Sequence, residues 1–168
     1  MVYMTTMKIS AIKKRLSYSR KTGLFTRKIA VPRGAVGSVA GTKSRRDGYV
    51  HVKIFGKQHK AHRLAWAFIT GRWPARDVEH RDTNRSNNRW RNLRLANDSQ
   101  NQANANKRVD NTSGCKSVSR RKDSGKYRAR IQVRKRRLSL GDHRTSKLAH
   151  AAYCKAAKKH FGEYARVK

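Results

Sequence analysis

Acidic residues are scarce in this chain of 168 residues. Nine Asp and Glu stand against 43 Lys and Arg, so the formal net charge is +34. Self-repulsion of this size opposes compaction and favours a polyanionic partner such as DNA, RNA or an anionic membrane surface. An enzyme for a small metabolite needs no such field, so the charge argues against that class.

The sequence also has little that would direct it to a membrane or out of the cell. No apolar run approaches the roughly 18 residues of a spanning helix, and Met1 to Lys8 lack the apolar stretch of a signal peptide. Two cysteines, Cys115 and Cys154, are too few for a disulfide framework or a four-thiolate zinc site. We therefore expect a cytoplasmic protein that faces nucleic acid and not a membrane.

Aromatic residues and basic residues are both spread along the chain. Three Trp, six Tyr and four Phe are not pooled in one segment, which favours several small cores over one large one. The basic residues form no single block at one end, which favours modules that each touch the polyanion. There is no internal repeat.

The first half of the chain predicts mixed helices and strands. Helical spacing covers residues 7–16, and a short strand follows Gly23. A basic loop spans 32–48, an alternating strand spans 49–55, and a turn at Gly56 leads into 58–61 as a hairpin. A short buried helix is expected over 62–71, ended by Gly71.

The second half changes character at Arg76, where asparagines become frequent and apolar residues rare. We expect a strand at 77–80, a loop at 81–89, a strand at 92–96, a helix at 98–108 and a linker at 110–114. Strands at 116–120, 127–133 and 137–140 precede a helix at 146–161. One face of that helix carries Ala149, Ala152, Tyr153, Ala156 and His160. The fold class is therefore α+β.

Three of the nine acids cluster around one histidine. Asp77, Glu79 and Asp82 lie within six residues and enclose His80. Carboxylates concentrated in a cationic chain can bind the divalent metal that a phosphodiesterase uses. Equally, they can simply neutralise neighbouring arginines, and clustering alone leaves both interpretations open.

Ordered asparagines favour the metal interpretation. Asn92 follows His80 by 12 residues and Asn101 follows it by 21. Four segments resemble, in their order and spacing, the HNH homing endonucleases of phages and bacteria. They are Glu79-His80, the loop at 81–89 (the Asn-rich loop), Asn92-Leu93-Arg94 and Gln100-Asn101. Glu79 stands where that family usually has Asp, which alters the geometry of the ligand.

The resemblance implies a role for each matching residue. His80 would be the general base and Asn92 would hold the loop that orients it. Glu79 and Asn101 would ligate one Mg²⁺ or Mn²⁺, and Arg94 would contact a DNA phosphate. No Cys-x-x-Cys pair brackets the motif, so no zinc is expected. This fold would be a small ββα-metal module.

The flanking segments carry their own resemblances. Residues 8–75 resemble the N-terminal portion that accompanies such nucleases, and 111–168 resemble the Apetala-type DNA-binding domain of plant ethylene-response factors. That domain is a three-stranded antiparallel sheet packed on one helix, as the pattern of 111–168 also predicts. The expected domains are therefore 1–75, 76–109 and 110–168.

The C-terminal sheet would present a row of arginines to the major groove. Alternation places Arg128 and Arg130 on one face and turns Ala129 and Ile131 toward the helix. The residues expected to bind DNA here are Arg120, Arg121, Arg128, Arg130 and Arg134. A generic solvated cationic face is the alternative.

Together these patterns predict a phage-type DNA endonuclease that cuts double-stranded DNA with site preference, in the host cytoplasm. A non-catalytic DNA-binding protein that retains the HNH scaffold stays open, as does an RNA-binding protein of ribosomal type. Monomer and dimer are both open. His62 is expected to pack and not to bind a ligand, and Trp66, Phe68 and Trp73 are expected to lie in the core. Trp90 is expected to pack over the motif loop, with stacking on DNA as the alternative.

Overall fold

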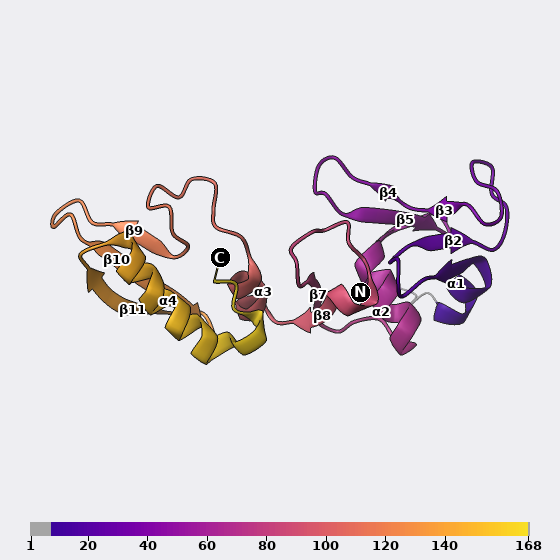
Figure 1. The fold of residues 1–168 in the computed structure, drawn as a ribbon. Helices are drawn as coiled ribbons and strands as arrows, with labels where there is room; N and C mark the ends of the chain where they lie inside the picture. Colours follow the sequence, from indigo (N-terminus) through magenta and orange to yellow (C-terminus); the bar gives the residue numbers. More distant parts are fainter. Residues whose placement is uncertain (1–7, 168) are drawn as a thin grey trace, which may run out of the picture. The chain divides into compact units, whose positions relative to one another are not determined.

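A computed structural model describes residues 8–167 of the chain (Figure 1). It divides into two compact units, Met1–Leu95 and Ala96–Lys168. Each combines helices with small antiparallel sheets, so the expected α+β class is confirmed, while the three expected domains stay a prediction. Met7, the start of the first expected helix, lies outside the described residues, as do all but the last of residues 1–8.

The described part of the first unit, from residue 8 onward, contains three small sheets and two α-helices. Its elements are α1 (Ile9–Arg15), β1 (Leu16–Tyr18), β2 (Phe25–Arg27), β3 (Val39–Ala40), β4 (Thr42–Lys43), β5 (Val50–Ile54), β6 (Lys57–Lys60), α2 (Ala61–Thr70), β7 (Asp77–His80), the 3-10 turn η1 (Trp90–Asn92) and β8 (Leu93–Ala96), whose last residue opens the second unit. The sheets have the orders β1-β2-β3, β4-β5-β6 and β7-β8. The strands β3 and β4 lie inside the segment at 32–48 that was expected to be a loop. The sequence did not predict them because a strand of two residues is too short to show alternation.

One hydrophobic core joins these elements. Ile12, Phe25, Val52 and Leu64 are almost fully buried in it. Helix α2 ends at Gly71, whose φ of 75° is the left-handed conformation that glycine adopts readily at a helix end. The expected hairpin of 49–61 and the helix that follows it are confirmed.

The turn between β1 and β2 lies directly against the segment that follows the Asn-rich loop. The Tyr18 hydroxyl donates to the Asn88 carbonyl at 2.7 Å, and the Trp90 N–H donates to the Arg20 carbonyl at 3.1 Å. Gly23 has a φ of 78°, and a Cβ on it would lie 2.4 Å from the Arg89 nitrogen and the Asn88 carbonyl carbon. Only glycine therefore fits at this crossing of two backbones.

We expect Gly23→Ala to lower the free energy of unfolding by about 2 kcal/mol or more, because it adds a backbone clash to left-handed strain. Gly37→Ala is the matched control, since Gly37 has a φ of 81° and a Cβ on it would meet nothing within 4 Å. Chemical denaturation of both variants measures the difference. Equal losses would show that the close approach at Gly23 contributes nothing.

The second unit contains a three-stranded antiparallel sheet covered by one long helix (Figure 1). Its elements are α3 (Asp98–Asn104), β9 (Val118–Arg120), β10 (Tyr127–Val133), β11 (Arg136–His143), α4 (Ser146–Phe161) and the 3-10 turn η2 (Gly162–Tyr164). The sheet order is β11-β10-β9. Ala129 and Ile131 are buried beneath α4, as the alternation predicts.

The buried face of α4 differs in part from the expected one. Ala149 and Tyr153 are buried as expected, but Ala157 and Phe161 continue the face. The buried residues of α4 are spaced four apart along the helix, so the row that faces the sheet reaches Phe161 and leaves His160 exposed.

Helix α3 is shorter than expected and belongs to the second unit. It begins with a capping box in which the Asn97 side chain accepts from the Gln100 N–H. It ends at Asn104 and not at 108, because Lys116 Nζ donates to the carbonyls of Ala103 and Ala105 at 2.6 and 2.7 Å. Ala103 also packs in the cluster that contains Tyr153.

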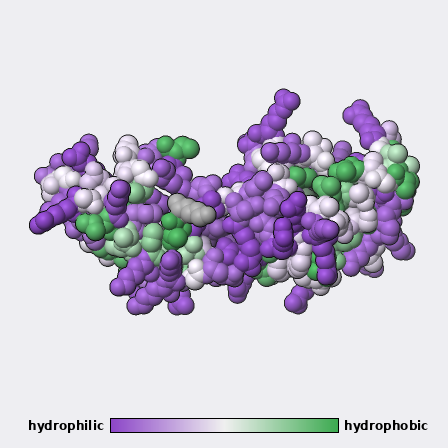
Figure 2. Space-filling view, viewed as in Figure 1, coloured by the Kyte–Doolittle hydropathy of each residue, from purple (hydrophilic) through white to green (hydrophobic). Residues whose placement is uncertain are grey.

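Hydrophilic residues dominate the face drawn in Figure 2. Among residues 8–167, no helix combines the length and the apolar character needed to cross a bilayer. Both cysteines are free thiols.

Candidate active site

Strand β7 buries three consecutive residues, of which two are ionisable. Val78, Glu79 and His80 are each at most 6 % exposed. Successive side chains of a strand point to opposite sides, so Glu79 and His80 face different surroundings. Glu79 meets Arg94 of β8, and His80 meets the first turn of α2, which packs against β7.

Asn88 holds one ring nitrogen of His80. Its Nε2 lies 3.1 Å from Oδ1 of Asn88, and since a carbonyl oxygen only accepts, Nε2 donates. The lone pair of the neutral ring is then on Nδ1. Burial lowers the pKa of His80, against smaller raising effects from the Asn88 hydrogen bond and the Asp82 charge. His80 is therefore neutral at physiological pH and able to accept a proton.

Two aromatic rings fix the plane of the His80 ring. The His62 ring centroid lies 5.0 Å away in an edge-on arrangement, and Tyr49 lies 6.1 Å away. Burial, followed by the nearby His80, lowers the pKa of His62 to about 3. His62 is thus a neutral side chain that packs against His80, as expected.

Asn92 connects β8 to the loop that follows His80. Its Oδ1 accepts from the Asp82 N–H at 3.1 Å, and its Nδ2 donates to Asp82 Oδ1 at 2.9 Å and to the Asn87 carbonyl at 2.8 Å. One buried amide therefore holds both ends of the loop, and the loop in turn supplies Asn88 to His80.

Asp82 is committed to the same loop. Burial raises its pKa, but hydrogen bonds from Asn87, Asn92 and the Asn84 N–H outweigh burial and leave the pKa below its ordinary value. The carboxylate is therefore ionised near His80, where it stabilises an imidazolium. The sequence places Asp82 two residues after His80, but its role depends on how the loop folds and could not be predicted from residue type and spacing.

Glu79 and Arg94 form a buried ion pair. Arg94 Nε donates to Glu79 Oε1 at 2.5 Å, and the two side chains are 7 % and 4 % exposed. This differs from the expected phosphate contact at Arg94, because a guanidinium in this pair faces a carboxylate inside the protein. Sequence analysis missed the pair, although the opposite charges sit centrally on two neighbouring strands.

Asn101, the second expected metal ligand, lies on α3 of the second unit, where it is partly exposed. A carboxylate at Glu79 and an amide oxygen at Asn101 are ligands that Mg²⁺ accepts. A carboxylate has two oxygens, so a ligand role for Glu79 is chemically compatible with its Arg94 pair. Across residues 8–167, no three His, Cys, Asp or Glu side chains gather into a metal site by themselves.

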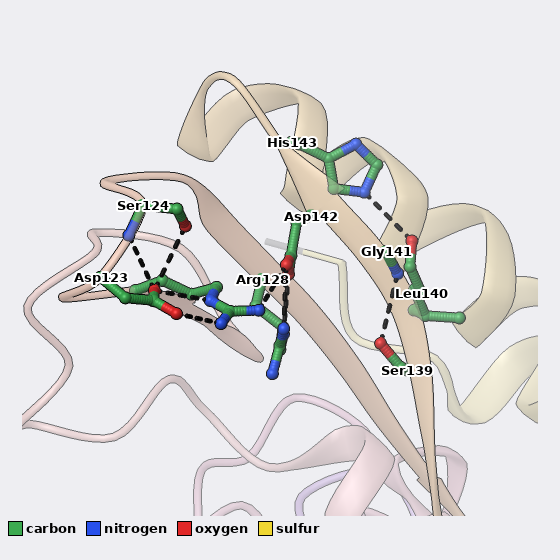
Figure 3. Close-up of polar contacts among 9 residues, drawn as sticks. Asp123, Ser124, Arg128, Ser139, Leu140, Gly141, Asp142 and His143 are labelled. Carbon is green, nitrogen blue, oxygen red and sulfur yellow. Dashed lines mark hydrogen bonds and ion pairs between the residues drawn. The ribbon is translucent and has the colours of Figure 1, made fainter.

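The C-terminal sheet uses two of its expected DNA-binding arginines in ion pairs (Figure 3). Arg128 donates to both oxygens of Asp142, at 2.7 and 2.9 Å. Arg121 donates to Asp142 at 2.9 Å and also pairs with Asp123. Arg120, Arg130 and Arg134 are exposed. The positive charge of the sheet is therefore partly neutralised at Arg121 and Arg128.

The tryptophans of the first unit pack as expected. The rings of Trp66 and Trp90 lie 5.0 Å apart, and Trp73 stacks on His59 at 5.3 Å. Trp66, Phe68 and Trp73 lie against the main core.

The expected site residues thus fall into two groups. The first unit holds His80 and Asn92 in one network with Asn88, Asp82 and His62, and holds Glu79 and Arg94 as a separate buried pair. The second unit carries Asn101 and the arginines of the C-terminal sheet. Comparison with curated proteins and with solved structures finds no match. Residues 59–103, which run from β6 to α3, match the HNH endonuclease family. This segment is similar to that family over the whole His80 site, and the similarity supports an HNH nuclease that acts on DNA.

Proposed function

We propose that this protein is a metal-dependent DNA endonuclease of the phage homing type, which hydrolyses phosphodiester bonds in double-stranded DNA with site preference. The observation that carries the proposal is the hold on His80. Its Nε2 is fixed by Asn88 while the Asn92 amide clamps the loop that bears Asn88. Any buried histidine needs a hydrogen-bond partner, but a general base also needs its ring held in one orientation, which the Asn92 clamp on the loop provides.

In the proposed reaction His80 accepts a proton from the attacking water at Nδ1. The ionised Asp82 stabilises the imidazolium that results. Asn92 acts through the loop and is a positioning residue. The products implied by the family resemblance carry a 5′ phosphate and a 3′ hydroxyl.

Glu79 and Asn101 would hold one Mg²⁺ or Mn²⁺. The chemistry that such an ion would supply is polarisation of the scissile phosphate and stabilisation of the departing oxygen. Arg94 fixes the Glu79 carboxylate from inside the protein, so its proposed contribution is to orient this ligand.

The second unit would bring the DNA to the site. Arg120, Arg130 and Arg134 are exposed and free to reach phosphates or guanine edges. Arg121 and Arg128 would reach DNA only if they leave Asp142 or share it. The proposed reader is the Apetala-like sheet of this unit.

A non-catalytic DNA-binding protein is the second candidate, favoured by one observation. The Glu79 carboxylate is only 5 % exposed and already pairs with Arg94, as in a scaffold whose metal site has become a structural ion pair.

Cleavage of supercoiled plasmid separates the two candidates. With Mg²⁺ or Mn²⁺ the endonuclease nicks or linearises the plasmid, and EDTA abolishes the cleavage. Intact plasmid with either metal, together with a gel shift of the same DNA, would support the scaffold and overturn the endonuclease. His80→Ala is the control against a contaminating nuclease.

A further inference from the structure

A cavity of about 490 Å³ opens in the first unit where the β1–β2 turn meets the end of the Asn-rich loop. We call it the turn cavity. Its lining residues are Arg20, Lys21, Thr22, Arg89, Trp90 and Arg91. Four of these six residues carry a positive charge.

The walls of the turn cavity are fixed by backbone contacts. The Tyr18 hydroxyl bonds the Asn88 carbonyl, the Trp90 N–H bonds the Arg20 carbonyl, and Gly23 touches the backbone at Asn88 and Arg89. Two cationic segments far apart in the sequence are therefore held together by the fold, and the site is preorganised.

Among residues 8–167, the positive charges of the turn cavity have no acidic partner. Within the described part of the chain, no hydrogen bond or ion pair engages the side-chain nitrogens of Arg20, Lys21, Arg89 and Arg91. The carboxylates of the first unit make contacts elsewhere: Asp47 with His51, Asp77 with Arg63, Glu79 with Arg94, and Asp82 with Asn87. Four like charges around one cavity repel each other, so an anion bound there is favoured.

The turn cavity adjoins the His80 site along the chain. Asn88, whose Oδ1 accepts from His80, immediately precedes Arg89. Guanidinium groups suit phosphate because they donate in a planar fork. The partly buried Trp90 adds an aromatic surface on which a nucleotide base can stack.

We propose that the turn cavity binds phosphates of the DNA strand beside the scissile one and so seats that strand against His80. This inference rests on the proposed endonuclease function. It assigns a DNA contact to the first unit, in addition to the arginines of the C-terminal sheet.

The test compares binding of a short labelled duplex by the full chain in EDTA, across a series of KCl concentrations. The slope of log affinity against log salt is negative, and each lost phosphate contact reduces its magnitude by about 0.9. Arg89→Ala/Arg91→Ala should therefore reduce the magnitude of this slope by roughly two units and weaken DNA binding roughly tenfold or more. Arg20→Ala/Lys21→Ala should give the same loss from the other wall.

Lys53→Ala/Lys57→Ala is the control of equal charge, because both lysines are exposed on the β5–β6 hairpin. The inference requires a smaller change in slope for this control than for the cavity variants. Equal slopes for wild type and Arg89→Ala/Arg91→Ala, or equal losses in cavity and control variants, would overturn it. Thermal melting checks that each variant is folded.

The two proposals fail in different ways. A protein that binds through the turn cavity in EDTA but cuts no plasmid with any divalent ion contradicts the endonuclease and keeps the cavity site. A protein that cuts plasmid while Arg89→Ala/Arg91→Ala retains the wild-type slope and cleavage rate keeps the endonuclease and removes the cavity site.

Discussion

His80→Ala is expected to slow plasmid cleavage by roughly a hundredfold to ten-thousandfold, the usual contribution of a positioned general base. The imidazole is held at Nε2 by Asn88, and alanine leaves no group that can take the proton from water. Single-turnover cleavage at saturating protein measures the loss, since it separates the chemical step from DNA binding.

DNA binding should survive this substitution. His80 is 5 % exposed, and the proposed phosphate contacts lie on other residues. A gel shift by His80→Ala equal to that of wild type, together with lost cleavage, fits the proposed role. Cleavage by His80→Ala at the wild-type rate would remove His80 as the base.

The pH profile gives a second readout on the same residue. Only the neutral imidazole accepts a proton, so the rate falls where His80 becomes protonated. Because burial places the pKa of His80 below its ordinary value of 6.5, we expect cleavage to stay level down to about that pH and to fall below it. A fall with a midpoint above 6.5 would contradict a buried, neutral base.

Arg94→Met should lower the free energy of unfolding by about 3–5 kcal/mol, because it leaves the buried Glu79 carboxylate without its partner. The side chains of this pair are 7 % and 4 % exposed, so water cannot replace the guanidinium. Urea denaturation measures the change.

Two controls define this prediction. Arg33→Met removes an exposed arginine of the same unit and should change stability little. Glu79→Gln/Arg94→Met should recover a large part of the stability, because no unpaired charge remains. If Arg94→Met is as stable as Arg33→Met, the buried pair does not hold this unit together.

Local patterns in the sequence predicted most of the secondary structure. Alternation found β5 and β10, and helical spacing found α2 and α4. The strand expected at 77–80 is β7, while Asn92, expected to begin the next strand, ends η1 just before β8. These features depend on neighbours along the chain, so one sequence is enough to reveal them.

The site was harder to predict where it depends on contacts between distant segments. The Glu79–Arg94 pair needs the pairing of two strands, and the Arg128–Asp142 pair needs two strands of another sheet. The end of α3 is set by Lys116, 12 residues after Asn104. Residue type and spacing do not encode such contacts, so Arg94 and Arg128 read as exposed cations in the sequence.

The place of α3 bears on how parts of this chain can be exchanged between proteins. The family match ends at residue 103, but Ala103 already packs with Tyr153 and its carbonyl accepts from Lys116. A chimaera joined at the end of the match would separate α3 from the apolar residues that it packs against, and Lys116 would lose its hydrogen bond to Ala103. A junction between Leu95 and Ala96 keeps each core whole. A chimaera that keeps both units folded would therefore be joined inside the HNH-like segment at 59–103, with α3 kept together with the C-terminal unit.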